Sequence, residues 1–294
     1  MSISPGLIRF VPLAFVLLWS TGFIGARYGL PHIEPFHLLL LRMLMTLVVF
    51  GGLILVFRAS WPTPRQALHQ MVAGALVHGC YLGGVFAAIK WQLPAGVTSI
   101  LVGLQPVLTA VLAWALWRQR LVGRQWLGLL LGLLGVMLVL GTGLQPGRFE
   151  LRPEAVAAGL VALVGISIGT LYQKRFGVGT DLLTGSFYQY LSTALMMAVL
   201  TYLLEDQTVN WHPELIGALL WLVFGLSVSA ILLLMLMIRE GEVARVASYF
   251  YLVPPMTALE AWWLFDEQLS PLALAGMVLT VVGVYLVLKT RPAR

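Results

Sequence analysis

The stretch Leu252–Phe265 reads LVPPMTALEAWWLF and is strongly apolar, yet it holds two adjacent prolines and one acid, Glu260. A second stretch, Leu104–Trp117, reads LQPVLTAVLAWALW and matches the first at a constant offset of 148 positions. The matched pairs are Leu104 with Leu252, Pro106 with Pro254, Thr109 with Thr257, Ala110 with Ala258 and Trp114 with Trp262. The acid is not repeated, because Leu112 stands at the position of Glu260. The two stretches indicate an internal duplication whose copies differ at one charged position.

The composition around these stretches is that of a membrane protein. The chain has 294 residues, of which 60% are hydrophobic and 10% are charged, and its mean hydropathy is +0.91. Soluble globular domains carry about 25% charged residues, so this chain has too few polar side chains to cover a surface that faces water. The composition therefore indicates that lipid is the solvent, and it excludes a soluble enzyme.

Ten apolar windows are long enough to cross a bilayer core about 30 Å thick, which requires roughly 20 residues of α-helix. They lie at about 8–27, 36–57, 69–91, 95–117, 124–143, 154–174, 182–204, 213–238, 243–265 and 271–289. Unpaired backbone groups are costly in lipid, and the windows are too long and too continuously apolar for barrel strands. The predicted fold is therefore an all-α integral membrane protein with ten transmembrane helices. A single cysteine, Cys80, excludes a disulfide within the chain.

The basic residues indicate the orientation, since short cytoplasmic loops are enriched in lysine and arginine. A cytoplasmic N-terminus places thirteen of the 18 basic residues on the cytoplasmic side, and it places only four on the other side: Arg27, Lys90, Arg148 and Arg152. The sequence thus predicts a protein of the inner (plasma) membrane with both termini in the cytoplasm. This topology accounts for the net charge of +6, so the expected partner of the basic face is anionic lipid and no nucleic acid is expected.

The duplication extends through the whole chain. Further matched pairs are Ser20 with Ser167, Gly128 with Gly276, and Gly135 with Gly283. We predict a first repeat at 1–145 with five spans, a connector at 146–153, and a second repeat at 154–294 with five spans and a short cytoplasmic tail. An odd number of spans in each half means that the second half enters the membrane from the opposite side. Such inverted repeats are typical of secondary transporters, which hold their site between the halves and work by alternating access.

Five segments carry a recognisable pattern: Trp19–Phe23, Leu41–Arg42, Pro254–Ala261, Asp266–Ser270 and Gly276–Val284. Together they resemble the EamA family of the drug/metabolite transporter superfamily, and the resemblance covers nearly the whole chain as two repeats. It implies ten helices, cytoplasmic termini and a basket-like bundle around a central cavity, with amino acids, other metabolites and drugs as substrates that are often exported. The first repeat departs from the pattern, because Arg118–Arg120 stands where the second has Asp266–Gln268. The family's acidic loop residue is therefore carried over only to Glu267.

Arg42 and Glu260 are charged residues inside predicted spans. Each lies about six or seven residues from the same membrane surface, which is a depth of roughly 10 Å at 1.5 Å per residue. Charges at such depth are costly and usually face the protein interior or a water-filled cavity. We predict that the two share a polar network that serves gating or ion coupling; a static ion pair and separate snorkelling side chains are the alternatives. Because burial can raise the pKa of a carboxyl group, protons are a candidate coupling ion, with facilitated diffusion as the alternative.

Seven further side chains are predicted to line the substrate cavity: Trp19, Ser20, His78, Tyr81, Gln105, Tyr249 and Tyr251. His78 and Tyr81 are three residues apart and share one helix face, and a histidine can titrate near neutral pH. The 182–204 span adds Tyr188, Gln189 and Tyr190. An aromatic cavity of this kind suits an amphipathic or aromatic metabolite. Ordinary packing is the alternative for the aromatics, close helix approach for Ser20, and a hydrogen bond to a backbone carbonyl for His78.

Pro106 in the first half, and Pro254 with Pro255 in the second, predict a helix break near the middle of the membrane. Each proline removes a helical hydrogen bond and frees a carbonyl one turn earlier. Equivalent breaks in two repeats suit a pair of hinges that also present polar backbone groups to a ligand. A static kink is the alternative.

Motifs for other functions are missing from the sequence. It has no GxxxxGK[ST] phosphate-binding loop and no HExxH motif, so no ATP drive, cofactor or metal site is expected and an enzyme is not indicated. The sequence thus predicts a secondary transporter that exports a small organic metabolite, such as an amino acid or a drug-like compound. A channel-like pore, a multi-span membrane enzyme and a scaffold are the alternatives. The sequence determines neither the substrate nor the oligomeric state.

Overall fold

The computed structural model describes residues 10–117, 122–141, 152–177, 179–230, 233, 252–267 and 270–289. These residues form helices joined by turns. The described ranges contain no β-strand, although an isolated antiparallel bridge joins Ile33 to Val209. The predicted all-α fold is therefore confirmed for this part of the chain.

The helices follow one another with short connections. Those of the first half are α2 (Val11–Gly29), α3 (Pro35–Phe57), α4 (Pro64–Gly74), the π-helical η1 (Ala75–Cys80), α5 (Tyr81–Lys90), α6 (Ala95–Val102), α7 (Gln105–Trp117) and α8 (Gly123–Gly141). Those of the second half are α9 (Pro153–Phe176), α10 (Leu182–Leu204), α11 (Pro213–Leu220), the π-helical η3 (Trp221–Ala230), α14 (Val253–Phe265) and α15 (Pro271–Lys289). Helices α4, η1 and α5 run on without a gap, as do α11 and η3, so each set makes one membrane-length rod.

The helix starts are encoded locally. Proline is the first residue of α3, α4, α9, α11 and α15, where its fixed φ suits the helix and its missing N–H is not needed. Thr63 and Gln66 form a reciprocal capping box at the start of α4. The carboxylate of Asp181 accepts hydrogen bonds from the N–H groups of Leu183 and Thr184 at the start of α10. These signals lie within a few residues of the helix ends and do not depend on tertiary contacts.

Two carboxylates of the second half cap helices of the first half. Glu205 accepts from the N–H groups of Phe36 (2.7 Å) and His37 (2.8 Å) at the start of α3. Glu267, the acidic position that the family resemblance identifies, accepts from Ala95 (3.3 Å) and Gly96 at the start of α6. The first N–H groups of a helix have no partner within the helix, and these two carboxyl groups satisfy some of them, so both contacts stabilise the packing of one half on the other.

The stability contributed by Glu205 is expected to depend on pH. Burial raises the pKa of its carboxyl above the ordinary value of 4.5, although the N–H groups of Phe36 and His37 act in the opposite direction. The carboxyl group of Glu205 therefore stays protonated to a higher pH in the folded state than in the unfolded state. Its stabilisation is complete below about pH 4.5 and is lost as the pH rises through the raised folded pKa.

The melting temperature of the wild type in detergent should fall as the pH rises above about 4.5, and we expect Glu205→Gln to lack this pH dependence. Glu154→Gln, at an exposed position in the first turn of α9, is the matched control and should keep the slope of the wild type. Parallel pH profiles for wild type and Glu205→Gln would contradict the prediction.

Within the described ranges, six helical stretches are long and apolar enough to cross a membrane: Val11–Gly29, Pro35–Phe57, Pro64–Lys90, Pro153–Phe176, Leu182–Leu204 and Pro213–Ala230. They coincide with six of the ten predicted windows. The 95–117 window is divided in the structure, because α6 ends at Val102 and α7 begins at Gln105. The 124–143 and 271–289 windows correspond to the apolar helices α8 and α15. The structure describes the 243–265 window only from residue 252 onward.

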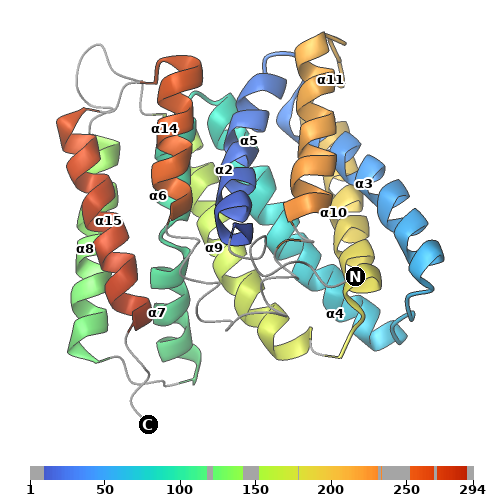
Figure 1. Ribbon diagram of the computed structural model, residues 1–294, viewed down its shortest axis with the longest axis horizontal. Helices are drawn as coiled ribbons and strands as arrows, with labels where there is room; N and C mark the ends of the chain where they lie inside the picture. Colours follow the sequence, from blue (N-terminus) through green and yellow to red (C-terminus); the bar gives the residue numbers. More distant parts are fainter. Residues whose placement is uncertain are drawn as a thin grey trace.

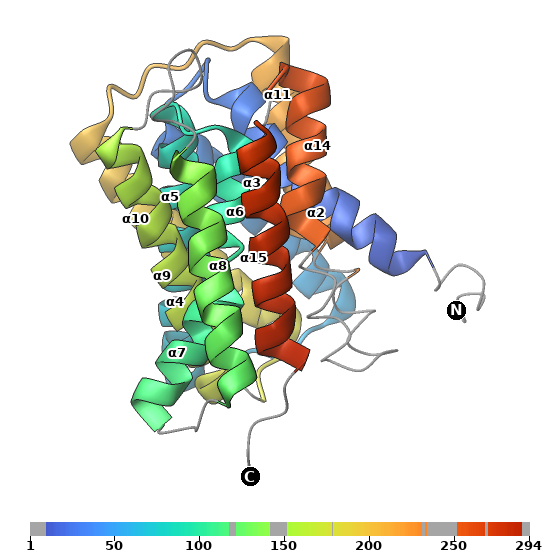
Figure 2. The same ribbon diagram turned by 90° about the vertical axis from the view of Figure 1, so that its left-hand side faces the viewer.

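The helices stand roughly parallel in one bundle, with α3 and α10 side by side at one edge and α8 and α15 at the other (Figure 1). Figure 2 shows α8 and α15 lying in front of the rest of the bundle. Large aromatic and aliphatic side chains are buried between the helices, among them Phe15, Phe50 and Phe86. Other apolar side chains point outward, such as Leu55 (79% exposed) and Trp263 (76% exposed). An apolar exterior around an apolar core is the pattern expected in lipid.

Helices α8 and α15 pack through glycines. A Cβ atom added at Gly276 would lie 2.5 Å from the carbonyl oxygen of Gly135, and one added at Gly283 would lie 2.5 Å from that of Gly128. The two contacts run in opposite directions along the chain, so the helices are antiparallel. Small residues allow this close backbone approach, which is a common way for helices to associate in membranes.

Two π-helical segments, η1 and η3, interrupt otherwise α-helical rods. Such segments widen the helix by one residue per turn and often occur at functional sites. η1 carries His78 and η3 carries Ser227, and both side chains belong to the polar cluster described next.

Candidate functional site

Arg42 lies inside the bundle. It is on the third turn of α3 and is only 5% exposed. Its Nε donates a hydrogen bond to the Oγ of Ser227 on η3 at 3.2 Å. Its charge also acts on Tyr81, Tyr190 and His78, which lie close to it. No carboxylate of the described residues forms an ion pair with Arg42.

Polar and aromatic groups from α4, η1, α5, α10 and η3 complete the surroundings of Arg42. The rings of His78 and Tyr190 stack with centroids 4.8 Å apart and an interplanar angle of 16°. His78 also has a side-chain hydrogen bond with Gln189, whose Nε2 donates to Oε1 of Gln70 at 2.7 Å. Tyr190 has a side-chain hydrogen bond with Ser227. We call Arg42, His78, Tyr81, Gln189, Tyr190 and Ser227 the arginine cluster.

A second polar group joins α2 to α14. The Oγ of Ser20 donates to Oε1 of Glu260 at 2.7 Å, and the hydroxyl of Thr257 donates to the carbonyl of Ser20 at 3.4 Å. Ser20 and Thr257 are fully buried. Within the described residues, Oε2 of Glu260 is buried and has no hydrogen-bond partner. We call Ser20, Thr257 and Glu260 the glutamate cluster; its second carboxylate oxygen is free to bind a proton or a donor from a ligand.

Helix α2 connects the two clusters. Trp19 is the neighbour of Ser20, and it has a side-chain hydrogen bond with Tyr81 of the arginine cluster. The structure thus brings the predicted residues Trp19, Ser20 and Tyr81 into one region between α2, α3, α5 and α14. This arrangement requires tertiary packing, because Ser20 and Glu260 are 240 positions apart in the sequence.

The remaining predicted residues lie elsewhere or outside the described part. Gln105 donates through Nε2 to the hydroxyl of Thr170 at 2.9 Å, which places it against α9. Pro106 is the second residue of α7, and Pro254 and Pro255 are in the first turn of α14. Tyr249 and Tyr251 lie outside the described residues. The structure shows no ion pair between Arg42 and Glu260, so a network that links these two charges stays a prediction.

Three members of this region, Ser227, Gln70 and Thr257, were not predicted as site residues from the sequence. Ser227 is buried and is the direct partner of Arg42, and Gln70 is buried against Gln189. Their only sequence signal is a polar side chain within an apolar window. Small polar residues such as serine are common in such windows for close packing alone, so this signal does not separate a site residue from a packing residue.

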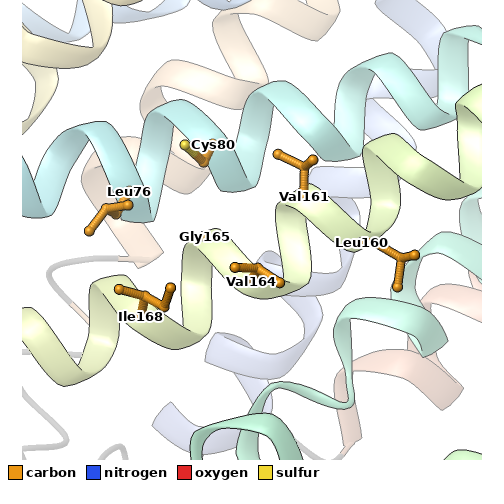
Figure 3. A pocket seen from close by; sticks show the side chains of 7 residues that line it. All are labelled: Leu76, Cys80, Leu160, Val161, Val164, Gly165 and Ile168. Atoms are coloured by element: carbon orange, nitrogen blue, oxygen red, sulfur yellow. The ribbon is translucent and has the colours of Figure 1, made fainter. Parts of the chain in front are cut away.

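A hollow between η1 and α9 has a volume of about 300 Å³ (Figure 3). It is lined by apolar side chains and one thiol: Leu76, Cys80, Leu160, Val161, Val164, Gly165 and Ile168. None of the predicted site residues lines it. Its side chains from α9 are about half exposed, and its lining is apolar, so it suits an acyl chain of the bilayer better than a polar substrate.

A helical bundle with an apolar exterior, a buried arginine and a half-buried carboxylate is typical of a polytopic membrane protein with a polar interior. The chain belongs to the EamA-like transporter family, whose model matches residues 7–141 and 154–289. The resemblance noted from the sequence is therefore confirmed. The family and the names of the relatives below identify a transporter rather than an enzyme.

Relatives match the chain along most of its length. The uncharacterized transporter YvbV of Bacillus subtilis (strain 168) is 26% identical over 281 residues, which cover 94% of this chain and 90% of that protein. The probable amino-acid metabolite efflux pump of Salmonella typhimurium (strain LT2) is 25% identical over 289 residues, covering 94% of this chain and 93% of that protein. A crystal structure of a protein with 22% identity covers 96% of each chain with a TM-score of 0.64, which shows that the fold is shared.

Proposed function

We propose that this protein is a secondary transporter that exports a small carboxylate-bearing metabolite of the amino-acid type. The observation that carries the proposal is the buried Arg42, which has no carboxylate partner among the described residues. An uncompensated buried charge is costly, and an intramembrane cation that faces the protein interior usually serves a substrate or ion pathway. A carboxylate of the substrate would compensate it. The printed name of the Salmonella relative, an amino-acid metabolite efflux pump, supports the same substrate class.

The glutamate cluster is the proposed site for the substrate's amino group or for a coupling proton. Glu260 is the acid that the first repeat lacks, and its Oε2 has no partner among the described residues. Trp19, the neighbour of Ser20, and Tyr81 of the arginine cluster interact with each other and would pack against the apolar part of the substrate. A zwitterion with a carboxylate at Arg42 and an ammonium at Glu260 would satisfy both charges.

The proposed mechanism is alternating access by rocking of two inverted repeats, 1–145 and 154–294. The glycine contacts of α8 and α15 support it, because Gly128 matches Gly276 and Gly135 matches Gly283 in the duplication. In the structure Gly135 meets Gly276 and Gly283 meets Gly128, which is the reciprocal pattern of a two-fold axis. The basic cytoplasmic loops support a plasma-membrane location with both termini inside.

Flux in proteoliposomes tests the function. We expect saturable uptake with counterflow for zwitterionic amino-acid-type compounds and much weaker uptake for their methyl esters, which lack the carboxylate. Unsaturable flux would support a channel instead. Equal transport of the acids and their esters would contradict the role of Arg42.

Glu260→Gln is expected to lower the affinity for the zwitterion by roughly 10- to 100-fold, because a hydrogen bond to a charged group contributes about 1.5–3 kcal/mol. If Glu260 also carries the coupling proton, accumulation driven by a pH gradient should be lost while counterflow exchange remains. Glu154→Gln, an exposed change of the same kind, is the control and should transport like the wild type. An unchanged affinity and an unchanged response to the pH gradient in Glu260→Gln would contradict both roles.

A further inference from the structure

One end of the bundle brings together two histidines and a glutamate from distant parts of the chain. His32 lies in the turn between α2 and α3, His212 is the N-cap residue of α11, and Glu214 is in the first turn of α11. His32 and Glu214 are 182 positions apart. The cluster lies outside the arginine and glutamate clusters, and the proposed transport mechanism does not use it.

The two histidine side chains converge on one carboxylate oxygen of Glu214. Oε2 of Glu214 lies 2.9 Å from Nε2 of His32 and 3.7 Å from Nδ1 of His212. The two imidazole rings are nearly parallel, with centroids 4.6 Å apart and an interplanar angle of 10°. Each residue offers one ligand atom, and the three atoms lie within 4.8 Å of one another.

The backbone holds these side chains in place. The N–H of Asn210 donates to the carbonyl of His32 at 2.9 Å, and Ile33 forms the antiparallel bridge with Val209. The α2–α3 turn is therefore fixed to the segment that leads into α11. A preorganised backbone lowers the entropy that must be lost when a ligand binds between the two segments.

We propose that His32, His212 and Glu214 form a binding site for one divalent transition-metal ion of the zinc type. Two imidazoles and one carboxylate are a donor set that zinc takes in proteins, with a fourth position left for water. Zinc–ligand distances of about 2.0–2.2 Å require ligand atoms roughly 3–3.5 Å apart, so the site must contract on binding. The side chains of His212 and Glu214 are 47% and 52% exposed, which leaves them room to rotate and leaves the ion an open position toward solvent.

A bound ion would connect the two halves of the chain. It would hold the α2–α3 turn against α11, and α11 continues into η3, which carries the Arg42 partner Ser227. Any motion of η3 relative to α3 would then be opposed at this end of the bundle. Slower transport in the presence of zinc is the expected consequence. This consequence rests on the proposed transport function, whereas the binding of the ion does not.

Calorimetric titration of Zn²⁺ into the purified full-length protein, with any polyhistidine tag removed, tests the site. We expect one ion per chain, a higher melting temperature, and no comparable response to Mg²⁺ or Ca²⁺, which prefer oxygen ligands. Co²⁺ should give the visible absorption of a tetrahedral or five-coordinate nitrogen–oxygen complex. The variants are His32→Gln, Glu214→Gln and His212→Asn; asparagine keeps a helix-capping side chain while it removes the imidazole.

Each variant is expected to weaken Zn²⁺ binding at least about tenfold without lowering the melting temperature of the metal-free protein much. His69→Gln is the control, since His69 lies on α4 and contacts Tyr172 instead. Absence of stoichiometric Zn²⁺ binding in the wild type, or binding that persists unchanged in all three variants, would overturn the site. Zinc binding without an effect on flux would leave the site in place and exclude only its proposed consequence.

Discussion

Replacing Arg42 by glutamine is expected to reduce transport of a carboxylate substrate by roughly 30-fold or more. Truncation of one partner of a buried, hydrogen-bonded charge pair costs about 2–5 kcal/mol, and each 1.4 kcal/mol corresponds to about a factor of ten. Arg42 is 5% exposed and has Ser227, Tyr81, Tyr190 and His78 around it, so no water shell replaces the lost charge. Initial rates of uptake into proteoliposomes, measured over a range of substrate concentrations, give the ratio directly.

Two further variants separate the charge of Arg42 from its packing. Arg42→Lys keeps the charge but loses the planar guanidinium, so partial activity is expected. Arg58→Gln, at the exposed C-terminal end of the same helix, should transport like the wild type. If Arg42→Gln is folded and transports carboxylates as fast as the wild type, the anion site does not lie at Arg42. Folding is checked by melting temperature, because the loss of a buried charge can itself raise stability.

The largest effect on stability is expected at the contact between α8 and α15. Gly276→Ala and Gly283→Ala each place a Cβ atom 2.5 Å from a backbone carbonyl of α8, and backbone cannot move aside as a flexible side chain can. Overpacking of this kind costs about 1–3 kcal/mol, which corresponds to a fall in melting temperature of roughly 2–10 °C for a chain of this size. Thermal unfolding in detergent, followed by circular dichroism, measures it.

The same substitution at an open position provides the control. Gly52 lies inside α3, and a Cβ atom added there meets nothing within 4 Å. Gly52→Ala should be neutral or stabilising by up to about 1 kcal/mol, because alanine has the higher helix propensity. Equal melting temperatures for Gly276→Ala and Gly52→Ala would show that α8 and α15 do not pack through their glycines.

The helices were largely predictable because their signals are local. The predicted windows 36–57 and 182–204 lie within one residue of Pro35–Phe57 and Leu182–Leu204, since each begins at a proline or an aspartate cap and continues as an apolar run. The 95–117 window was predicted as one span with a break at Pro106, and in the structure it is divided between Val102 and Gln105. The close approach at the division was not predictable: a Cβ atom added at Gly103 would lie 2.9 Å from the side chain of Pro254 in the other half of the chain.

The site was predictable as a set of residues but not as a set of contacts. Arg42 and Glu260 are identifiable because a charge within an apolar helix is costly in lipid and usually serves a function. Their partners are not identifiable in this way. Ser227 for Arg42 and Ser20 for Glu260 are small hydroxyl residues, and such residues are frequent in membrane helices for packing alone.

The sequence by itself determined that this chain is an all-helical membrane protein of a transporter family, because hydropathy, proline position and charge are properties of each segment. Only the tertiary structure decided which side chains meet. It placed Ser20 against Glu260 across 240 positions and His32 against Glu214 across 182. The physical reason is that these bonds depend on how helices pack and rotate against one another, and an apolar helix can present several different faces to its neighbours with little change in its own sequence.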